Sequence, residues 1–106
     1  MSINLFHGET NDVAITAKAS PSMEIAPGLH SYQATASTTD AGSAVIDIQG
    51  SNELTPTNWV TLGTISLSPN NSTVTDGFTT FAAWKYTRAN ITTLTGTSPQ
   101  VKVWVN

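Results

Sequence analysis

The stretch SAVIDIQGS, residues 43 to 51, decides the fold class because apolar and polar side chains alternate along it. In an extended chain Ala44, Ile46 and Ile48 fall on one face, and the positions between them carry Val, Asp and Gln on the other face. A period of two residues is that of a half-buried β-strand, whereas a helix repeats every 3.6 residues. The sequence therefore predicts a strand here, with Ile46 and Ile48 in the core.

Similar short segments recur along the chain and are separated by clusters of Gly, Pro, Asn and Asp. These residues favour turns because Gly and Asn tolerate left-handed backbone angles and Pro fixes φ, and we expect turns at 68–72 and 76–78. No helical period extends beyond about two turns. The pattern predicts an all-β protein, either a two-sheet sandwich or a small barrel. The further strand segments are 13–19, 30–37, 59–68 and 100–106.

Aromatic and basic residues gather in AAWKYTRANI, residues 82 to 91. In a regular strand Trp84, Tyr86 and Arg88 would share one face, yet the apolar residues change face after Tyr86. Either the strand is covered on both sides, or a bulge near Thr87 shifts the phase. In both cases we expect Trp84 in the core or at its edge, and Arg88 along an aromatic ring or beside a carboxylate.

The predicted core draws on four of these segments. In 59–68 the apolar alternation continues only if one residue of phase is absorbed, so Gly63 is the expected site of a bulge or bend. In the last segment three valines alternate with Lys102 and Trp104. The candidate core residues are Ile46, Ile48, Trp59, Leu62, Trp84, Tyr86, Arg88 and Val103.

The composition excludes several kinds of site. A chain of 106 residues has the size of one domain, and we assign 12–106 to a single β-domain. Charged residues make up 10%, against roughly 25% in an average soluble protein, and 18 Thr, 11 Ser and 8 Asn supply neutral polar groups instead. A net charge of −3 offers no basic footprint for nucleic acid. The absence of Cys excludes disulfides, zinc thiolates and thiol catalysis.

The chemistry-bearing residues form no recognisable constellation. His7 and His30 are the two histidines, and neither has a second ligand at metal spacing. The seven carboxylates include no calcium-loop motif. We expect no catalytic, cofactor-binding or metal-binding residue, and therefore no enzyme. No signal-peptide pattern and no apolar run of about 20 residues is present, so we expect synthesis in the cytoplasm and no membrane partner.

Two features indicate contacts with other molecules. The first segment, 1–11, carries Ile3, Leu5 and Phe6, and it is either a first strand at the sheet edge or an extended arm laid on a neighbouring subunit. Trp104 falls on the face opposite the valines of the last strand, where it is either covered or part of a subunit interface. These four residues are the candidate interface.

From residue 43 onward the chain resembles a group of small virion proteins of tailed bacteriophages. The similarity lies in NWVTLGTISLS (58–68), in DGFTTFAAWKYTRANITTLTG (76–96) and in VKVWVN (101–106). Members share a Trp-x-x-Leu-Gly strand, an Asp-Gly-Phe turn and a Trp-x-Tyr-x-Arg-Ala-Asn strand that ends in Thr-Gly. The aromatic and Arg pair on a late strand also resembles discoidin-like jelly rolls.

The pattern of strands and turns predicts seven or eight short strands, and the resemblance implies that they form an antiparallel, jelly-roll-like β-sandwich. It implies a non-enzymatic capsid decoration, or cement, protein on the outer shell, often a trimer, with the major capsid protein and copies of itself as partners. The expected location is the capsid surface of the virion, after synthesis in the host cytoplasm.

Two rival functions remain open at this stage. Small sandwiches also serve as tail or neck components of phages. A carbohydrate-binding module would instead stack sugars on an exposed Trp59 or Trp104, because aromatic faces bind sugar rings only where they are accessible.

Overall fold

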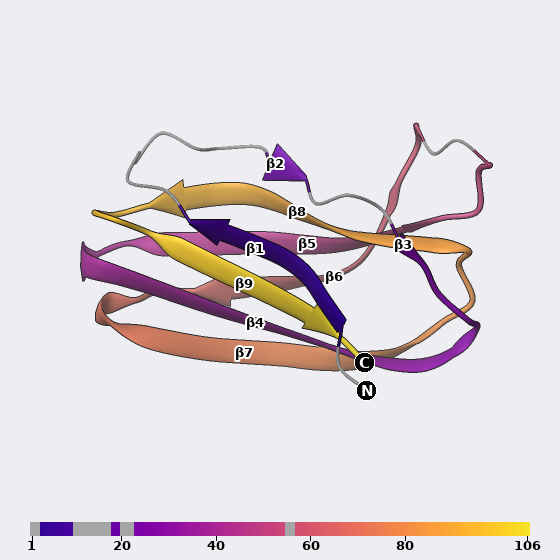
Figure 1. The fold of residues 1–106 in the computed structure, drawn as a ribbon, viewed down its shortest axis with the longest axis horizontal. Coiled ribbons are helices and arrows are strands. Elements are labelled where there is room, and N and C mark those ends of the chain that lie inside the picture. Colours follow the sequence, from indigo (N-terminus) through magenta and orange to yellow (C-terminus); the bar gives the residue numbers. More distant parts are fainter. Residues whose placement is uncertain (1–2, 10–17, 20–22, 55–56) are drawn as a thin grey trace.

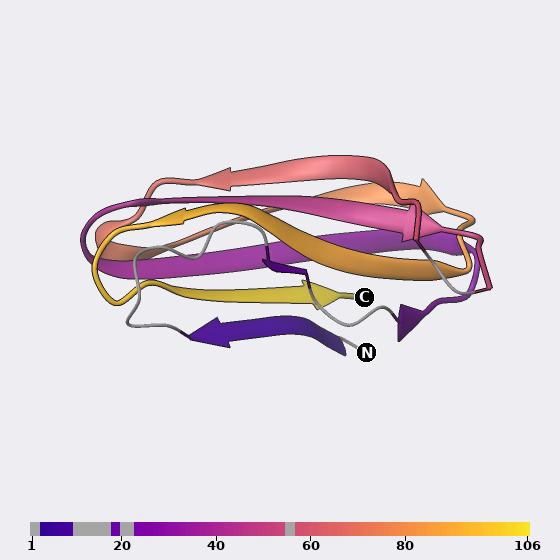
Figure 2. The same ribbon diagram turned by 90° about the horizontal axis from the view of Figure 1, so that it is seen from above.

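The chain folds as a sandwich of two antiparallel sheets (Figures 1 and 2). The computed structural model describes residues 3–9, 18–19, 23–54 and 57–106, with side chains from Glu24 onward in these ranges. The strands are β1 (Ile3–Glu9), β2 (Lys18–Ala19), β3 (Met23–Glu24), β4 (Gly28–Ala41), β5 (Ser43–Ser51), β6 (Val60–Leu67), β7 (Asn70–Ala82), β8 (Tyr86–Thr95) and β9 (Gln100–Val105).

Six of these strands build the two packed layers. The first three-stranded sheet has the order β9-β4-β7, and the second has the order β8-β5-β6. Strand β1 pairs with the free side of β9, while β2 and β3 both pair with β8. The expected all-β, antiparallel β-sandwich is confirmed.

The number and length of the strands differ from the expectation of seven or eight short ones. Nine strands occur within the described residues, and β4 and β7 are long, with 14 and 13 residues. The count is higher because β2 and β3 have two residues each, which is too short to show an alternating pattern. Strand β7 is longer than expected because the sequence predicted a turn at 76–78, and these residues lie within the strand.

The strand pairs are nested around the middle of the chain. Strand β5 pairs with β6, and the strands on either side of them, β4 and β7, pair with each other. The next strands outward continue this order, since β2 and β3 pair with β8 and β1 pairs with β9. The chain thus resembles one long hairpin, and its successive strand pairs lie alternately in one sheet and in the other.

The core lies between the sheets and consists of small and branched aliphatic side chains. Ile46, Ile48 and Val103 have no exposed surface, and Leu62 packs against the core while staying partly exposed. The other predicted core residues, Trp59, Trp84, Tyr86 and Arg88, are half-buried and lie outside the core cluster. The core cluster is Tyr32, Ala34, Ala36, Ala44, Ile46, Ile48, Ile65, Leu67, Ala89, Ile91, Leu94, Val101, Val103 and Val105.

Two bulges account for the changes of phase in the sequence. In β6 the register passes from Gly63, opposite Ile48, to Thr61, opposite Gln49, so Leu62 is the extra residue. The bulge is thus adjacent to Gly63, where a Cβ atom would lie 2.5 Å from the ring of Phe78. Strand β8 also has a bulge, but it lies at Thr92 and not near Thr87, where the sequence offered one.

In β8 the extra residue is Thr92, between Ile91, opposite Ile46, and Thr93, opposite Val45. Before it Thr87, Ala89 and Ile91 are all buried. Trp84 precedes the first residue of β8 and therefore does not follow the alternation of that strand at all.

The expected turn at 76–78 was wrong, because these residues lie in the middle of β7. Asp76, Gly77 and Phe78 pair with consecutive residues of β4 without a change of register. A Cβ atom on Gly77 would lie 2.3 Å from the backbone oxygen of Tyr32, so the close approach of β4 requires glycine here. The same Asp-Gly dipeptide that often marks a turn therefore serves strand pairing.

The first segment of the chain lies beside β9. The backbone register of β1 pairs Ile3 with Val105 and Phe6 with Val103, and it shifts between Asn4 and Phe6. The side chains of the candidate interface residues Ile3, Leu5 and Phe6 lie outside the described part of the structure.

Candidate functional site

The outer face of the β8-β5-β6 sheet carries a stack of aromatic and basic side chains. The Cζ atom of Arg88, on β8, lies 4.3 Å from the ring centroid of Trp59, which directly precedes β6. Arg88 Nε also donates a hydrogen bond to Gln49 Oε1 on β5, at 2.8 Å. Partial burial lowers the pKa of Arg88. The three side chains tie three strands together, so the cation of Arg88 is engaged within the protein.

Asp47, the carboxylate nearest along β5, has a different partner. Its Oδ1 accepts a hydrogen bond from Thr64 Oγ1 at 2.7 Å. Of the two arrangements expected for Arg88, the structure therefore has the aromatic one.

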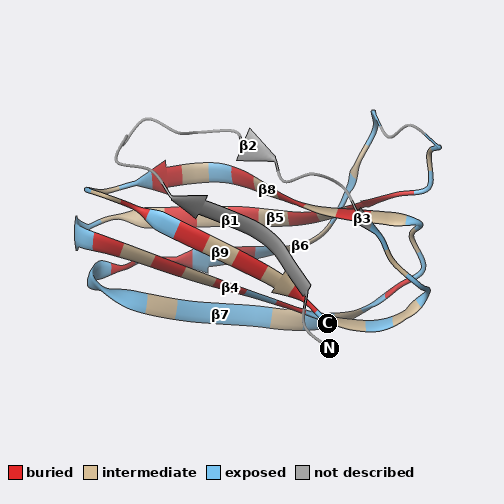
Figure 3. Ribbon diagram, in the orientation of Figure 1, coloured by how far each residue is buried: buried red, intermediate tan, exposed pale blue. Residues whose placement is uncertain are grey.

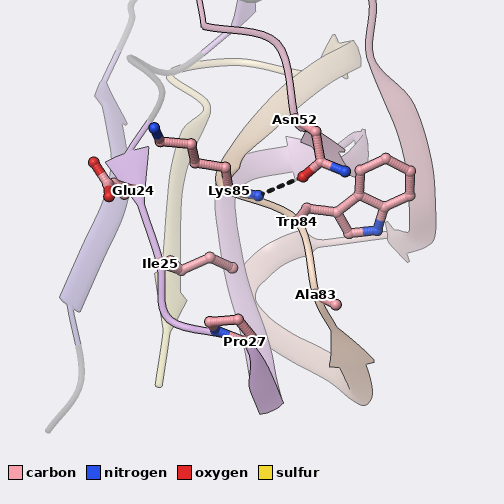
Figure 4. A pocket seen from close by; sticks show the side chains of 7 residues that line it. All are labelled: Glu24, Ile25, Pro27, Asn52, Ala83, Trp84 and Lys85. Atoms are coloured by element: carbon pink, nitrogen blue, oxygen red, sulfur yellow. Dashed lines mark hydrogen bonds between the residues drawn. The ribbon is translucent and has the colours of Figure 1, made fainter.

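A pocket opens at the end of the sandwich where β4 begins and β7 ends (Figure 4). Its volume is about 280 Å³. The segment after β3, the residue following β5 and the connection between β7 and β8 form its walls. The lining residues are Glu24, Ile25, Pro27, Asn52, Ala83, Trp84 and Lys85.

Backbone hydrogen bonds fix the shape of this pocket. The amide of Lys85 donates to Asn52 Oδ1 at 2.9 Å, and the carbonyl of Lys85 accepts from the amide of Ile25 at 3.0 Å. Trp84 packs over Gly50, where a Cβ atom would come within 2.6 Å of the indole. In Figure 4 the side chains of Glu24 and Lys85 lie on one side of the pocket and the Trp84 ring on the other.

Three of the seven side chains that line this pocket are polar or charged. Its lining holds one carboxylate and one ammonium group, Glu24 and Lys85, and no hydroxyl or imidazole. Lys85 Nζ lies 5.6 Å from the ring centroid of Tyr86, in the range of a cation–π contact. The described residues contain no cluster of three potential metal ligands.

His30 has a structural environment at the same end of the sandwich. Its Nε2 lies 2.7 Å from the carbonyl oxygen of Ala26, and its Nδ1 lies 3.3 Å from that of Asn106. It thus joins the segment before β4 to the end of β9. The side chain of His7 lies outside the described residues.

Trp104 is the one candidate interface residue whose side chain is described. It is half-buried on the outer face of the β1-β9-β4-β7 sheet, opposite Gln33 of β4 and Asn4 of β1. All three tryptophans of the chain are half-buried, and none is fully exposed.

The large exposed apolar residues were not among those singled out by the sequence. Leu29 and Phe81 are 71% and 70% exposed and lie opposite each other on β4 and β7. Leu54 and Val60 are also exposed. The alternation of 30–37 could have placed Leu29 on the outer face, but only the pairing of the two strands brings it beside Phe81.

Two carboxylates near strand ends are held by hydrogen bonds, Glu53 at the pocket end of the sandwich and Asp40 at the other end. Asp40 accepts from Thr97 Oγ1 at 2.8 Å and from the Thr97 amide at 2.6 Å, and these bonds lower its pKa. Glu53 accepts from the amides of Asn58 and Thr57, which lowers its pKa too. Both carboxylates therefore stabilise loops.

No protein-family model, curated protein or solved structure that we compared with this chain matches it. Within the described residues, no helix is long and apolar enough to span a membrane. The functional argument therefore rests on the residues and on their arrangement.

Proposed function

We propose that this chain is a non-enzymatic structural protein of a tailed-bacteriophage particle, which decorates the outer capsid shell by binding the major capsid protein and copies of itself. The observation that carries the proposal is the nested order of strand pairs. The sequence resemblance of residues 43–106 to small virion proteins supports it independently.

The nested order supports a jelly roll. In that fold an eight-stranded antiparallel ribbon wraps into two sheets, and it is the architecture of viral capsid domains and of lectins. The orders β1-β9-β4-β7 and β2-β8-β5-β6 fit such a ribbon, with β3 continuing β2 along β8. One fold hosts many unrelated functions, so the step from this fold to a capsid role is an analogy, which the sequence resemblance of residues 43–106 supports.

The surface also suits a protein that binds many identical sites weakly. Few charges cover it, and the two long strands β4 and β7 together carry ten Thr and Ser residues and two charged ones. On a capsid lattice, contacts that are individually weak add up because each bound copy also touches its neighbours. We place the capsid contact on the outer face that includes Trp104, since a partly exposed Trp is a common centre of interfaces.

The lectin alternative is less well supported. A sugar-stacking platform needs an accessible aromatic face, yet Arg88 lies over one face of Trp59. Trp84 packs on Gly50, so neither of these two indoles offers an open platform. Trp104 is half-buried and is the remaining tryptophan on which a sugar could stack.

Co-sedimentation with purified capsids, stripped of their peripheral proteins, tests the proposal. We expect saturable binding of the purified chain. A Trp104→Thr variant should bind about 30-fold more weakly, which corresponds to a hot spot of about 2 kcal/mol. Lys102→Thr, a change at a half-buried position on the same face of β9, is the matched control and should bind normally. A folded wild-type chain that fails to sediment with capsids would contradict the proposal.

A further inference from the structure

The four edges of the two sheets differ in how well they are protected. Strand β1 has a register shift between Asn4 and Phe6, and β6 has the extra residue Leu62. The edge along β8 is covered by the two-residue strands β2 and β3. Strand β7, in contrast, pairs with β4 from Ala82 to Ser72 with no shift, and its one register shift lies at its first residues, between Ser72 and Asn70.

From Ser72 to Ala82 the free side of β7 lacks the usual devices that prevent strand addition. Natural edge strands are kept apart by Lys, by Pro, by bulges or by being short. Strand β7 has 13 residues, contains neither Lys nor Pro, and carries a single charge, on Asp76. Among the described strands only β4 pairs with it. Most of its residues are exposed (Figure 3).

One hydrogen bond shows which backbone groups of β7 face its free side. The Gly77 amide donates to Oδ1 of Asp76, at 2.8 Å, and not to β4. Because amides alternate along a strand, Thr75, Thr79 and Phe81 also direct their N–H and C=O groups away from β4. The same residues have side chains on the outer face of the sheet.

We propose that two copies of this chain pair through their β7 strands, antiparallel, about a two-fold axis at Thr79. The sheets then form one continuous layer, and the two Thr79 residues exchange both of their backbone hydrogen bonds. The inference does not depend on the proposed function.

The side chains select this register. With the axis at Thr79, the exposed Phe81 of each copy lies opposite Gly77 of the other, where the missing side chain leaves room for the ring. In the dimer the amide of Gly77 donates to the carbonyl of Phe81 in the second copy, in place of the Asp76 carboxylate. The two Asp76 carboxylates are about 20 Å apart along the strands. An axis at Thr75 or at Gly77 itself would bring these two charges close together.

A single introduced cysteine gives a direct test, because the chain contains none. In Thr79→Cys the two thiols face each other across the axis, with Cα atoms about 5.5 Å apart, which suits a disulfide. Thr75→Cys is the matched control, since Thr75 is equally exposed on the same strand but would lie about 27 Å from its copy. We expect mild oxidation to cross-link the first variant and not the second. Equal cross-linking of both variants, or of neither, would overturn the proposal.

Charged side chains introduced at position 79 test the same axis without a covalent bond. Thr79→Lys and Thr79→Glu each place like charges opposite each other, and both should sediment as monomers of 11.2 kDa, whereas the wild type sediments at twice that mass. An equimolar mixture should restore the dimer. A monomeric wild type, a trimer, or variants that still dimerise alone would each overturn the inference.

Discussion

The guanidinium of Arg88 lies over the indole of Trp59, with 4.3 Å between its Cζ atom and the ring centroid. This contact joins β8 to the start of β6 across β5, and Gln49 on β5 accepts a hydrogen bond from the same guanidinium. Arg88 of β8 thus connects three neighbouring strands on the outer surface of the sandwich.

Replacing either partner of this contact should destabilise the fold modestly. We expect Trp59→Leu and Arg88→Met each to lower the free energy of unfolding by about 1 kcal/mol, because a partly exposed cation–π contact has about that strength. Urea denaturation of both single variants and of the double variant measures their coupling. Strictly additive effects would show that the two side chains do not stabilise each other.

The buried hydroxyl pair of Tyr32 and Thr87 predicts an asymmetry between two variants. Thr87 Oγ1 donates to the carbonyl of Gln49 at 3.0 Å, and Tyr32 OH lies 3.1 Å from Thr87 Oγ1. In Tyr32→Phe the bond from Thr87 to Gln49 remains, so the cost should be about 1 kcal/mol. In Thr87→Val both a buried hydroxyl and a carbonyl lose a partner, and the cost should approach about 3 kcal/mol. Equal losses of stability in denaturant titrations would contradict this hydrogen-bond network.

The packing of Trp84 on Gly50 predicts a specific steric conflict. A Cβ atom at position 50 would lie 2.6 Å from the indole, so Gly50→Ala should destabilise the protein by about 1–3 kcal/mol. It should also change the tryptophan fluorescence. In a Trp84→Ala background the same glycine substitution should cost much less. A cost that is unchanged in this background would show that the conflict lies elsewhere.

Asp40 predicts a loss of stability in acid. Hydrogen bonds from Thr97 lower the pKa of this carboxyl below its ordinary value of 3.8. The carboxylate therefore stabilises the fold fully above that value, and the contribution disappears as the pH falls through the lowered pKa. Thermal unfolding between pH 7 and pH 2 should show Asp40→Asn less stable than the wild type at neutral pH, with the difference vanishing in acid. A constant difference would exclude this origin.

The alternating pattern predicted the strands whose two faces differ in polarity. The bounds of β5, Ser43–Ser51, agree with the stretch that alternates in the sequence. Ile46 and Ile48 are fully buried as a consequence of that alternation. Periodicity succeeds here because one face of the strand packs in the core and the other faces solvent.

Features that depend on contacts between distant strands could not be read in this way. Gly77 looks like a turn residue in the sequence, but its role is set by the backbone of β4. Arg88 finds Trp59 only once β5 has placed β6 and β8 on its two sides. The exposed pair of Leu29 and Phe81 likewise exists only through strand pairing.

If the proposal is right, this chain is present in purified particles of a tailed phage that encodes it, and its copy number there tests the central proposal most directly. Quantitative mass spectrometry gives the ratio to the major capsid protein. Decoration of the lattice predicts roughly one copy per capsid subunit, because each binding site repeats with the shell. A handful of copies per particle would place the chain in the tail or neck, and its complete absence from particles would contradict a virion function.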